Sequence, residues 1–122
     1  GDLEHSHMIE PKDLGVTVRM ANLAVKHAGR RFDYVHMPVP RNRSDDAYFT
    51  PLNALDCPTT KLYIGLVHLT DGVAGTRKRL ETFRRHYRGD FGIATECGWG
   101  RRQTDTIQAL MEVHQKVAET IR

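Results

Sequence analysis

A carboxylate and a thiol stand side by side at Glu96 and Cys97, directly after a short apolar run. The run, residues 91–95, predicts a buried strand that is followed by a glycine-containing turn. Catalytic groups of α/β proteins commonly lie at the carboxyl ends of such strands. The pair therefore indicates proton transfer or metal binding. The structural alternative is a buried Cys97 that serves as a small hydrophobe beside a solvated Glu96.

Histidines also stand at the ends of the two earlier predicted strands. His36 lies in the last two residues of the strand predicted over residues 32–37, and His68 comes directly after the strand predicted over residues 61–67. Because parallel strands all end on one side of a sheet, we expect these groups to share a rim with Glu96 and Cys97. The candidate catalytic residues are His68, Glu96 and Asp71.

Imidazole, thiolate and carboxylate groups on one rim are a donor set suited to Zn²⁺. The candidate metal ligands are Cys97, His36, His68 and Glu96, and the N-terminal segment offers Asp2, Glu4, His5 and His7 as further donors. No CxxC or HExxH motif is present. Hydrogen-bonded structural histidines at the strand ends are the alternative interpretation.

Glycines and arginines in the loops after the predicted strands indicate anion binding. Glycine lets backbone N–H groups approach an anion at a helix N-terminus, and arginine pairs with carboxylate or phosphate through two nitrogens. The candidate anion-binding residues are Arg101, Arg102, Gly98, Gly72 and Arg41. Tight turns between strands and helices, and a surface loop around Arg41, are the alternatives.

A basic run occupies a predicted helix, with its charges at Arg77, Lys78, Arg79, Arg84, Arg85 and Arg88. We interpret the run as the solvated face of an outer helix, with nucleic-acid binding as the alternative. The aromatic residues between these charges, Phe83 and Tyr87, recur at helical spacing with Leu80 on the apolar side of the helix, which does not suggest base stacking. The sequence therefore favours the solvated face.

The elements that must position these groups alternate between helix and strand. Three helices are predicted: one over residues 14–28, one that contains residues 73–87, and one over residues 105–121. Asp13 is the expected N-terminal cap of the first helix, and Gly29 is expected to end it. A short apolar segment, residues 47–55, lies between the first two strands. Apolar residues, among them Val16, Met20 and Leu23, cover a broad face of the first predicted helix.

This order predicts an α/β fold of parallel βα units in a single domain that spans residues 1–122. Three strands are too few to close a (β/α)8 barrel, which takes about 250 residues. The chain is therefore either a small open sheet or the C-terminal part of such a barrel, a half barrel. A partial barrel leaves strand edges and an apolar face open, so we also expect self-association.

Composition narrows the class of protein further. The 122 residues carry a formal net charge of +3 and are 39% hydrophobic, with no apolar run long enough to span a membrane. The two cysteines give no disulfide framework, which predicts a cytoplasmic location. The mild positive charge suits small anionic molecules as well as nucleic acid.

Several motifs resemble the C-terminal portion of the cobalamin-independent methionine synthase-like family, whose members are (β/α)8 barrels. The most specific are Glu-Cys-Gly at 96–98 and His-Met-Pro-Val-Pro at 36–40. The resemblance also runs through residues 1–13, 34–41, 62–68 and 94–98, with Arg101 and Arg102.

The resemblance implies methyl transfer to a homocysteine-like thiol from a folate methyl donor at a zinc site. Cys97 matches the family's thiolate ligand at the end of the last strand. The family's His-x-Cys ligand pair precedes the segment that resembles Gly1 and Asp2, so the resemblance implies that this chain holds only part of the zinc site. A non-catalytic half-barrel scaffold that oligomerises, and a nucleic-acid-binding module that uses the basic helix, are the alternative functions.

Overall fold

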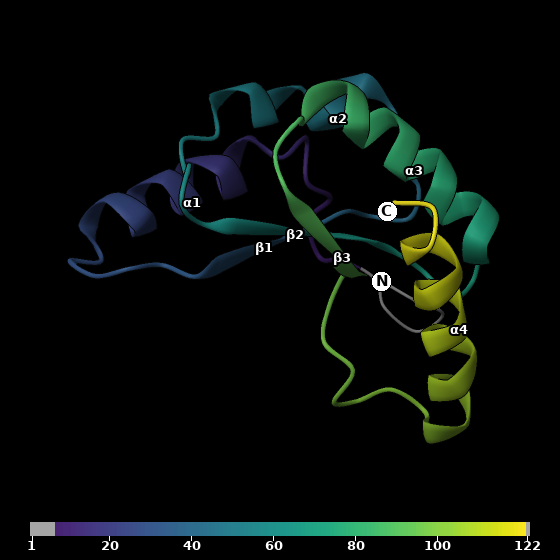
Figure 1. Cartoon of the computed structure of the whole chain (residues 1–122). Coiled ribbons are helices and arrows are strands. Elements are labelled where there is room, and N and C mark those ends of the chain that lie inside the picture. Colours follow the sequence, from purple (N-terminus) through teal and green to yellow (C-terminus); the bar gives the residue numbers. More distant parts are fainter. Residues whose placement is uncertain (1–6, 122) are drawn as a thin grey trace.

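The computed structural model describes residues 7–121 of the chain (Figure 1). Its longer helices are α1 (Gly15–His27), α3 (Gly72–His86) and α4 (Ile107–Ala118), and its strands are β1 (Tyr34–Pro38), β2 (Lys61–Val67) and β3 (Phe91–Thr95). A short helix α2 (Asp46–Phe49) runs into the 3-10 turn η1 (Thr50–Ala54), and a second turn, η2 (Thr104–Thr106), precedes α4.

The three strands form one parallel sheet in the order β1-β2-β3. Met37 lies beside Ile64, and Ile64 lies beside Ile93, so apolar residues align across all three strands. Each parallel connection contains a helix, as a crossover between parallel strands requires. The predicted α/β class with parallel βα units is confirmed, and membership of a (β/α)8 barrel stays a prediction.

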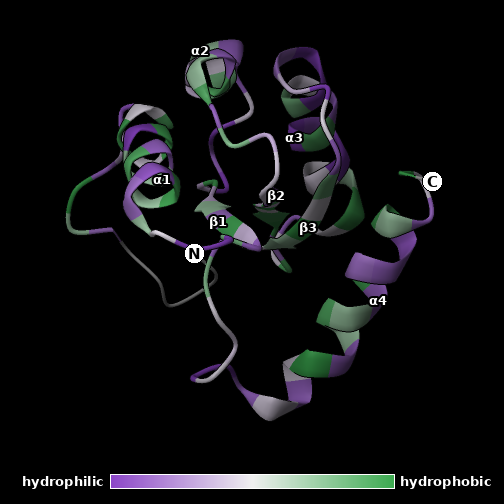
Figure 2. Cartoon of the chain, turned by 60° about the vertical axis from the view of Figure 1, so that its left-hand side comes forward, coloured by the Kyte–Doolittle hydropathy of each residue, from purple (hydrophilic) through white to green (hydrophobic). Residues whose placement is uncertain are grey.

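The core lies between one face of the sheet and its helices. Leu62, Ile64 and Leu66 alternate along β2 toward this face and are fully buried. Figure 1 and Figure 2 place α1, α2 and α3 on the same side of the sheet, and each of these helices contributes apolar residues to the core, among them Val18, Phe49 and Phe83. Phe49 and Phe83 pack edge to face, with ring centroids 6.1 Å apart, and so join α2 to α3.

On the opposite face of the sheet, glycines make room for rings from neighbouring strands. A Cβ atom on Gly65 would lie 2.8 Å from the carbonyl oxygen of Thr95 and 3.1 Å from Nε2 of His36. The His36 ring therefore crosses β2 at Gly65 and reaches β3. In the same way, the ring of Tyr63 covers Gly92 on β3.

The broad apolar face predicted for α1 is buried only in part. Val18 and Ala21 are buried, whereas Val16, Met20 and Leu23 are 58%, 66% and 58% exposed. The reason is that α1 contacts the rest of the described chain along one narrow stripe. Among residues 7–121, no helix is both long enough and apolar enough to cross a membrane.

The prediction of a solvated basic run is wrong for Arg79, which is only 1% exposed. Its guanidinium donates hydrogen bonds to the carbonyl oxygens of Leu66 (2.8 Å) and Arg41 (2.8 Å), and through two nitrogens to Asp71 (2.6 and 2.8 Å). These four acceptors replace the water that the charge loses. Arg77 and Lys78, the two residues that precede Arg79 in the helix, are exposed as predicted.

Candidate functional site

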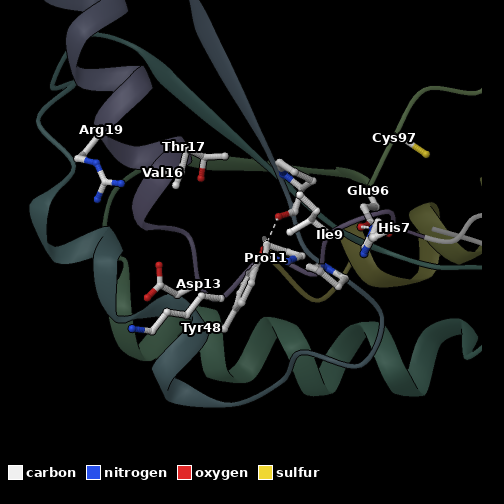
Figure 3. A pocket seen from close by; sticks show the side chains of 13 residues that line it. His7, Ile9, Pro11, Asp13, Val16, Thr17, Arg19, Tyr48, Glu96 and Cys97 are labelled. Carbon is white, nitrogen blue, oxygen red and sulfur yellow. Dashed lines mark hydrogen bonds and ion pairs between the residues drawn. The ribbon is translucent and has the colours of Figure 1, made fainter.

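The side chains of Glu96 and His7 meet at the carboxyl edge of the sheet. Glu96 follows β3 directly and is 6% exposed. His7 lies on the N-terminal segment, 89 positions earlier, and its Nε2 is 2.6 Å from Oε1 of Glu96. Figure 3 shows the two side chains in contact beside a cavity. A buried carboxylate against an imidazole is the arrangement that orients histidine for proton transfer in many enzymes.

His7 faces a second carboxylate through its other ring nitrogen. Nδ1 lies 3.1 Å from Oε2 of Glu10, whose side chain is 65% exposed. The two carboxylates thus differ in solvent exposure: the side chain of Glu96 is buried in the protein, and that of Glu10 is exposed to solvent. Both can accept hydrogen bonds only while both ring nitrogens carry hydrogen. Loss of the Nδ1 proton would therefore release Glu10 and leave Glu96 in place.

His68 lies beside the Glu96 carboxylate. It is 2% exposed, and its Nε2 donates to the carbonyl oxygen of Val39 at 2.8 Å. The same nitrogen lies 3.9 Å from Oε2 of Glu96, beyond hydrogen-bond distance. The bond to Val39 fixes the ring, so His68 packs against the carboxylate in a defined orientation.

His36 is bound to backbone in a similar way. Its Nε2 donates to the carbonyl oxygen of Thr95 at 2.9 Å, which ties β1 to the end of β3. Since a carbonyl oxygen can only accept, this nitrogen carries the hydrogen and has no lone pair for a metal. His36 therefore positions the residue that precedes Glu96.

Cys97 is exposed, and its sulfur points away from the His7–Glu96 pair in Figure 3. Its carbonyl oxygen accepts a 2.6 Å hydrogen bond from the Thr95 hydroxyl, and that hydroxyl accepts a 2.8 Å bond from Nε1 of Trp99. These two bonds fix the turn after β3. The turn places the Glu96 carboxylate inward and the Cys97 thiol outward.

A cavity of about 740 Å³ opens beside the pair (Figure 3). His7, Glu96 and Cys97 line one part of it, and Lys12 and Arg19 also contribute to the wall. The remaining lining is mostly apolar and comes from Ile9, Pro11, Val16, Pro38, Pro40 and Tyr48, with Asp13 and Thr17. The volume is that of a small-molecule site. The charged side chains of the lining are of both signs, with Lys12 and Arg19 cationic and Asp13 and Glu96 acidic.

The predicted zinc ligands do not form a metal site within residues 7–121. No group of three or more His, Cys, Asp or Glu side chains in this part of the chain is placed to hold a metal ion. Nε2 of His36 and of His68 is bonded to backbone, and Cys97 points outward. The residues named as further donors, Asp2, Glu4 and His5, lie outside the described residues. Zinc binding therefore stays a prediction, and the described donors do not fit it.

Asp71 lies near the carboxyl edge but is held in the ion pair with Arg79. Both of its oxygens accept from that guanidinium, at 2.6 and 2.8 Å. Gly72 follows with a φ of 57°, a conformation that favours glycine, and its N–H donates to the carbonyl oxygen of His68. Arg41 is exposed and joins this network only through its carbonyl oxygen. These three candidates fix the loop before α3 and do not line the cavity described above.

The predicted anion clamp lies apart from the cavity. Arg101 is exposed, and Nη1 of Arg102 donates to the hydroxyl of Thr106 at 3.3 Å. Gly98 is exposed in the turn between them and Glu96. The cationic residues that do line the cavity, Lys12 and Arg19, come from the N-terminal segment and α1.

Sequence reasoning left His7 out of the candidate catalytic residues. The signal was present as His-x-His at residues 5–7, but a histidine near a terminus has no strand end to place it. Only the tertiary structure brings this segment to the end of β3. Comparisons of the chain with family models, with curated proteins and with solved structures gave no match.

Proposed function

We propose that this chain carries the site of an enzyme that transfers a methyl group to a thiol, and that His7 is the base that takes the thiol proton. The observation that carries the proposal is the contrast between the two partners of His7. Buried Glu96 holds Nε2 at 2.6 Å, whereas Nδ1 faces the exposed and replaceable Glu10. The resemblance to the methionine synthase-like family supplies the reaction class.

The proposed reaction uses the side chains of this chain for binding and proton transfer. A thiol that enters the cavity displaces Glu10 from a neutral His7. The S–H bond breaks and its proton moves to Nδ1, while Glu96 stabilises the imidazolium that forms. The thiolate sulfur then bonds to the methyl carbon of a folate-type donor. The bond between that carbon and the donor nitrogen breaks, its electron pair stays on nitrogen, and that nitrogen takes up the proton from Nδ1 of His7, which regenerates the neutral imidazole.

The cavity wall supports an anionic substrate. Lys12 and Arg19 line the same cavity as His7, so a carboxylate on the substrate could pair with them while its thiol faces Nδ1. The apolar residues between, such as Ile9 and Val16, would exclude water from the body of the molecule. A short thiol amino acid of the homocysteine class has these groups.

Glu96→Gln tests the proposal, because glutamine keeps the shape of the side chain and removes its charge. We expect the rate of methyl transfer from methyltetrahydrofolate to homocysteine to fall about 10²-fold or more. The ultraviolet absorbance of the thiolate, recorded as a difference spectrum when homocysteine is added, should also disappear. Glu112→Gln is the matched control, since this exposed carboxylate on α4 also accepts one hydrogen bond, from Gln108. Equal rates and equal thiolate signals in wild type and Glu96→Gln would refute the proposal.

A second candidate function, an oligomeric scaffold, is favoured by the exposed stripe of Val16, Met20 and Leu23 on α1. These residues recur at helical spacing and are all more than half exposed. Within the described part of the chain, β1 pairs with a strand on one side only. Met20→Glu should shift sedimentation toward the monomer if the stripe joins two copies. A compact monomer in the wild type up to about millimolar concentration, the upper end of the usual range for weak association, would exclude this function.

A further inference from the structure

The segment that carries His7 has no regular structure of its own. Residues 7–14 contain bends and a turn but no helix or strand. One backbone bond joins the end of the segment to the rest of the fold, from the N–H of Leu14 to the carbonyl oxygen of Tyr48 (3.1 Å). The position of His7 therefore depends on side chains that reach the segment from elsewhere.

Arg43 provides such an anchor from the loop between β1 and α2. Its Nη1 donates to the carbonyl oxygens of Pro11 at 3.2 Å and Lys12 at 2.8 Å. Its Nε and Nη2 donate to the two carboxylate oxygens of Asp45 at 2.8 and 3.0 Å. One guanidinium thus joins the His7 segment to the loop, and the hydrogen bond with Asp45 raises the pKa of Arg43 and keeps it charged.

The far side of Arg43 is fixed to the sheet through Tyr48. The guanidinium carbon lies 4.7 Å from the centre of the Tyr48 ring, within the range of a cation–π contact. Tyr48 is 1% exposed, and its hydroxyl donates to the carbonyl oxygen of Pro38, the last residue of β1, at 3.0 Å. Asp45 caps α2 by accepting from the N–H of Tyr48 at 3.2 Å. Tyr48 and Asp45 therefore fix the guanidinium of Arg43 relative to β1 and α2.

We propose that Arg43 is a positioning residue that holds the segment of residues 7–13 against the carboxyl edge of the sheet, so that His7 meets Glu96. We call the contacts of Arg43 with Pro11 and Lys12 the clamp. The expected effect of the clamp on catalysis rests on the function proposed above, but its effect on the position of His7 does not. The segment is held at Pro11 and Lys12 by Arg43 and at His7 by Glu96. Without the first contact, the described hydrogen bonds to the rest of the fold hold the segment at its two ends, at His7 through Glu96 and at Leu14 through Tyr48. A displacement of about 1 Å at a catalytic group can cost about 10²-fold in rate.

The test compares Arg43→Ala with Arg85→Ala. Arg85 is a close match, because it also pairs with an aspartate through two nitrogens, to Asp46 at 3.1 Å. Its remaining hydrogen bond goes to the hydroxyl of Thr82 on its own helix, so within residues 7–121 it does not hold the N-terminal segment. The readouts are the imidazole nitrogen resonances of His7, amide hydrogen exchange over residues 8–13, and the rate of methyl transfer.

In Arg43→Ala we expect shifted His7 resonances, at least tenfold faster exchange over residues 8–13, and a tenfold or larger loss of methyl transfer with the fold intact by circular dichroism. Arg43→Lys should restore part of each, because an ammonium group can reach one carbonyl oxygen but cannot form the two-nitrogen pair with Asp45 as well. Arg85→Ala should leave all three readouts unchanged.

Unchanged His7 resonances and unchanged exchange in Arg43→Ala would overturn the clamp, whatever the activity. Shifted resonances in Arg43→Ala, combined with full activity in Glu96→Gln, would confirm the clamp and refute the proposed function. The two proposals therefore fail by different measurements.

Discussion

Asp71 and Glu96 follow neighbouring strands of the same sheet, yet the structure uses them in opposite ways. Asp71 gives both oxygens to the guanidinium of Arg79, which is buried at 1% exposure. Glu96 is itself buried but lines an open cavity and contacts His7 from a distant segment. The two carboxylates therefore differ in their partners. Asp71 faces a buried guanidinium that also holds two backbone carbonyl oxygens, whereas Glu96 faces an imidazole at the wall of a cavity, and this difference is the basis of the function proposed for Glu96.

The largest effect should come from removing the charge partner of Asp71. In Arg79→Met the carboxylate of Asp71 and the carbonyl oxygens of Leu66 and Arg41 lose their donors together. We expect the free energy of unfolding in urea to fall by about 3–5 kcal/mol, as for other broken buried ion pairs. Arg77→Met, on the exposed side of the same helix, is the control and should change stability by less than about 0.5 kcal/mol. A similar loss in both variants would show that Arg79 has no special role.

Exchanging the two carboxylates for amides should separate their roles directly. Asp71→Asn removes an acceptor of charge-assisted bonds, so we expect a loss of about 1.5–3 kcal/mol in unfolding free energy and unchanged affinity for homocysteine. In Glu96→Gln we expect the opposite pattern, with weaker binding of homocysteine than in Asp71→Asn and a smaller loss of unfolding free energy. Chemical unfolding and calorimetric titration of both variants check this. If both variants lose stability and neither loses thiol affinity, Glu96 is a structural group like Asp71.

Two glycines extend the contrast because each faces one of the carboxylate residues. A Cβ atom at Gly75 would overlap the carboxyl group of Asp71, and a Cβ atom at Gly65 would lie 3.0 Å from the Cα atom of Glu96. We expect Gly75→Ala and Gly65→Ala each to lower the unfolding temperature by an amount that corresponds to about 1–3 kcal/mol. Gly65→Ala alone should also shift the His36 ring resonances.

The control for both glycines is Gly100→Ala. A Cβ atom at Gly100 would have open space around it, with no described atom beyond its chain neighbours within 4 Å. This variant should therefore leave the unfolding temperature and the His36 resonances close to those of the wild type. A stabilising Gly75→Ala would mean that Asp71 moves freely.

The smallest effect is expected at an exposed carboxylate, Asp46. Hydrogen bonds from Arg85 and then from His86 lower its pKa from the ordinary value of 3.8 to about 2. Because the pKa of Asp46 is depressed in the folded state, its contacts with Arg85 and His86 stabilise the fold at pH values above the ordinary pKa of the carboxyl group. This contribution is lost as the pH falls through the pKa of Asp46 in the folded protein. The stability difference between wild type and Asp46→Asn should therefore shrink from about pH 4 to about pH 2. If the difference in unfolding free energy, measured by urea titration, is constant over this pH range, the contacts of Asp46 with Arg85 and His86 do not contribute to stability.

Much of the fold could be predicted from the pattern of apolar residues. The strands at residues 61–67 and 91–95 match the structure, and the helices agree within a few residues at their ends. Gly29 has a φ of 65°, as expected of a residue that ends a helix. These features are local, because spacing and turn residues specify them without reference to the rest of the chain.

The candidate site was predicted only in part, for a physical reason. The placement of Glu96 and His68 at one edge follows from parallel strands alone, and the structure puts both there. The role of each group depends on its partners, which the pattern of residues does not contain. His68 and His36 face carbonyl oxygens, and Cys97 faces outward because of the turn fixed by Thr95 and Trp99.

The order of helices and strands, the parallel sheet, and the edge at which polar side chains gather all follow from the amino-acid sequence. Periodicity and turn chemistry are short-range properties, and the chain carries them in every short window. The burial of Arg79 against Asp71 and the meeting of His7 with Glu96 across 89 positions are known only from the folded chain. Charge compensation and hydrogen bonding between distant segments depend on packing, and packing is specified by the whole chain at once.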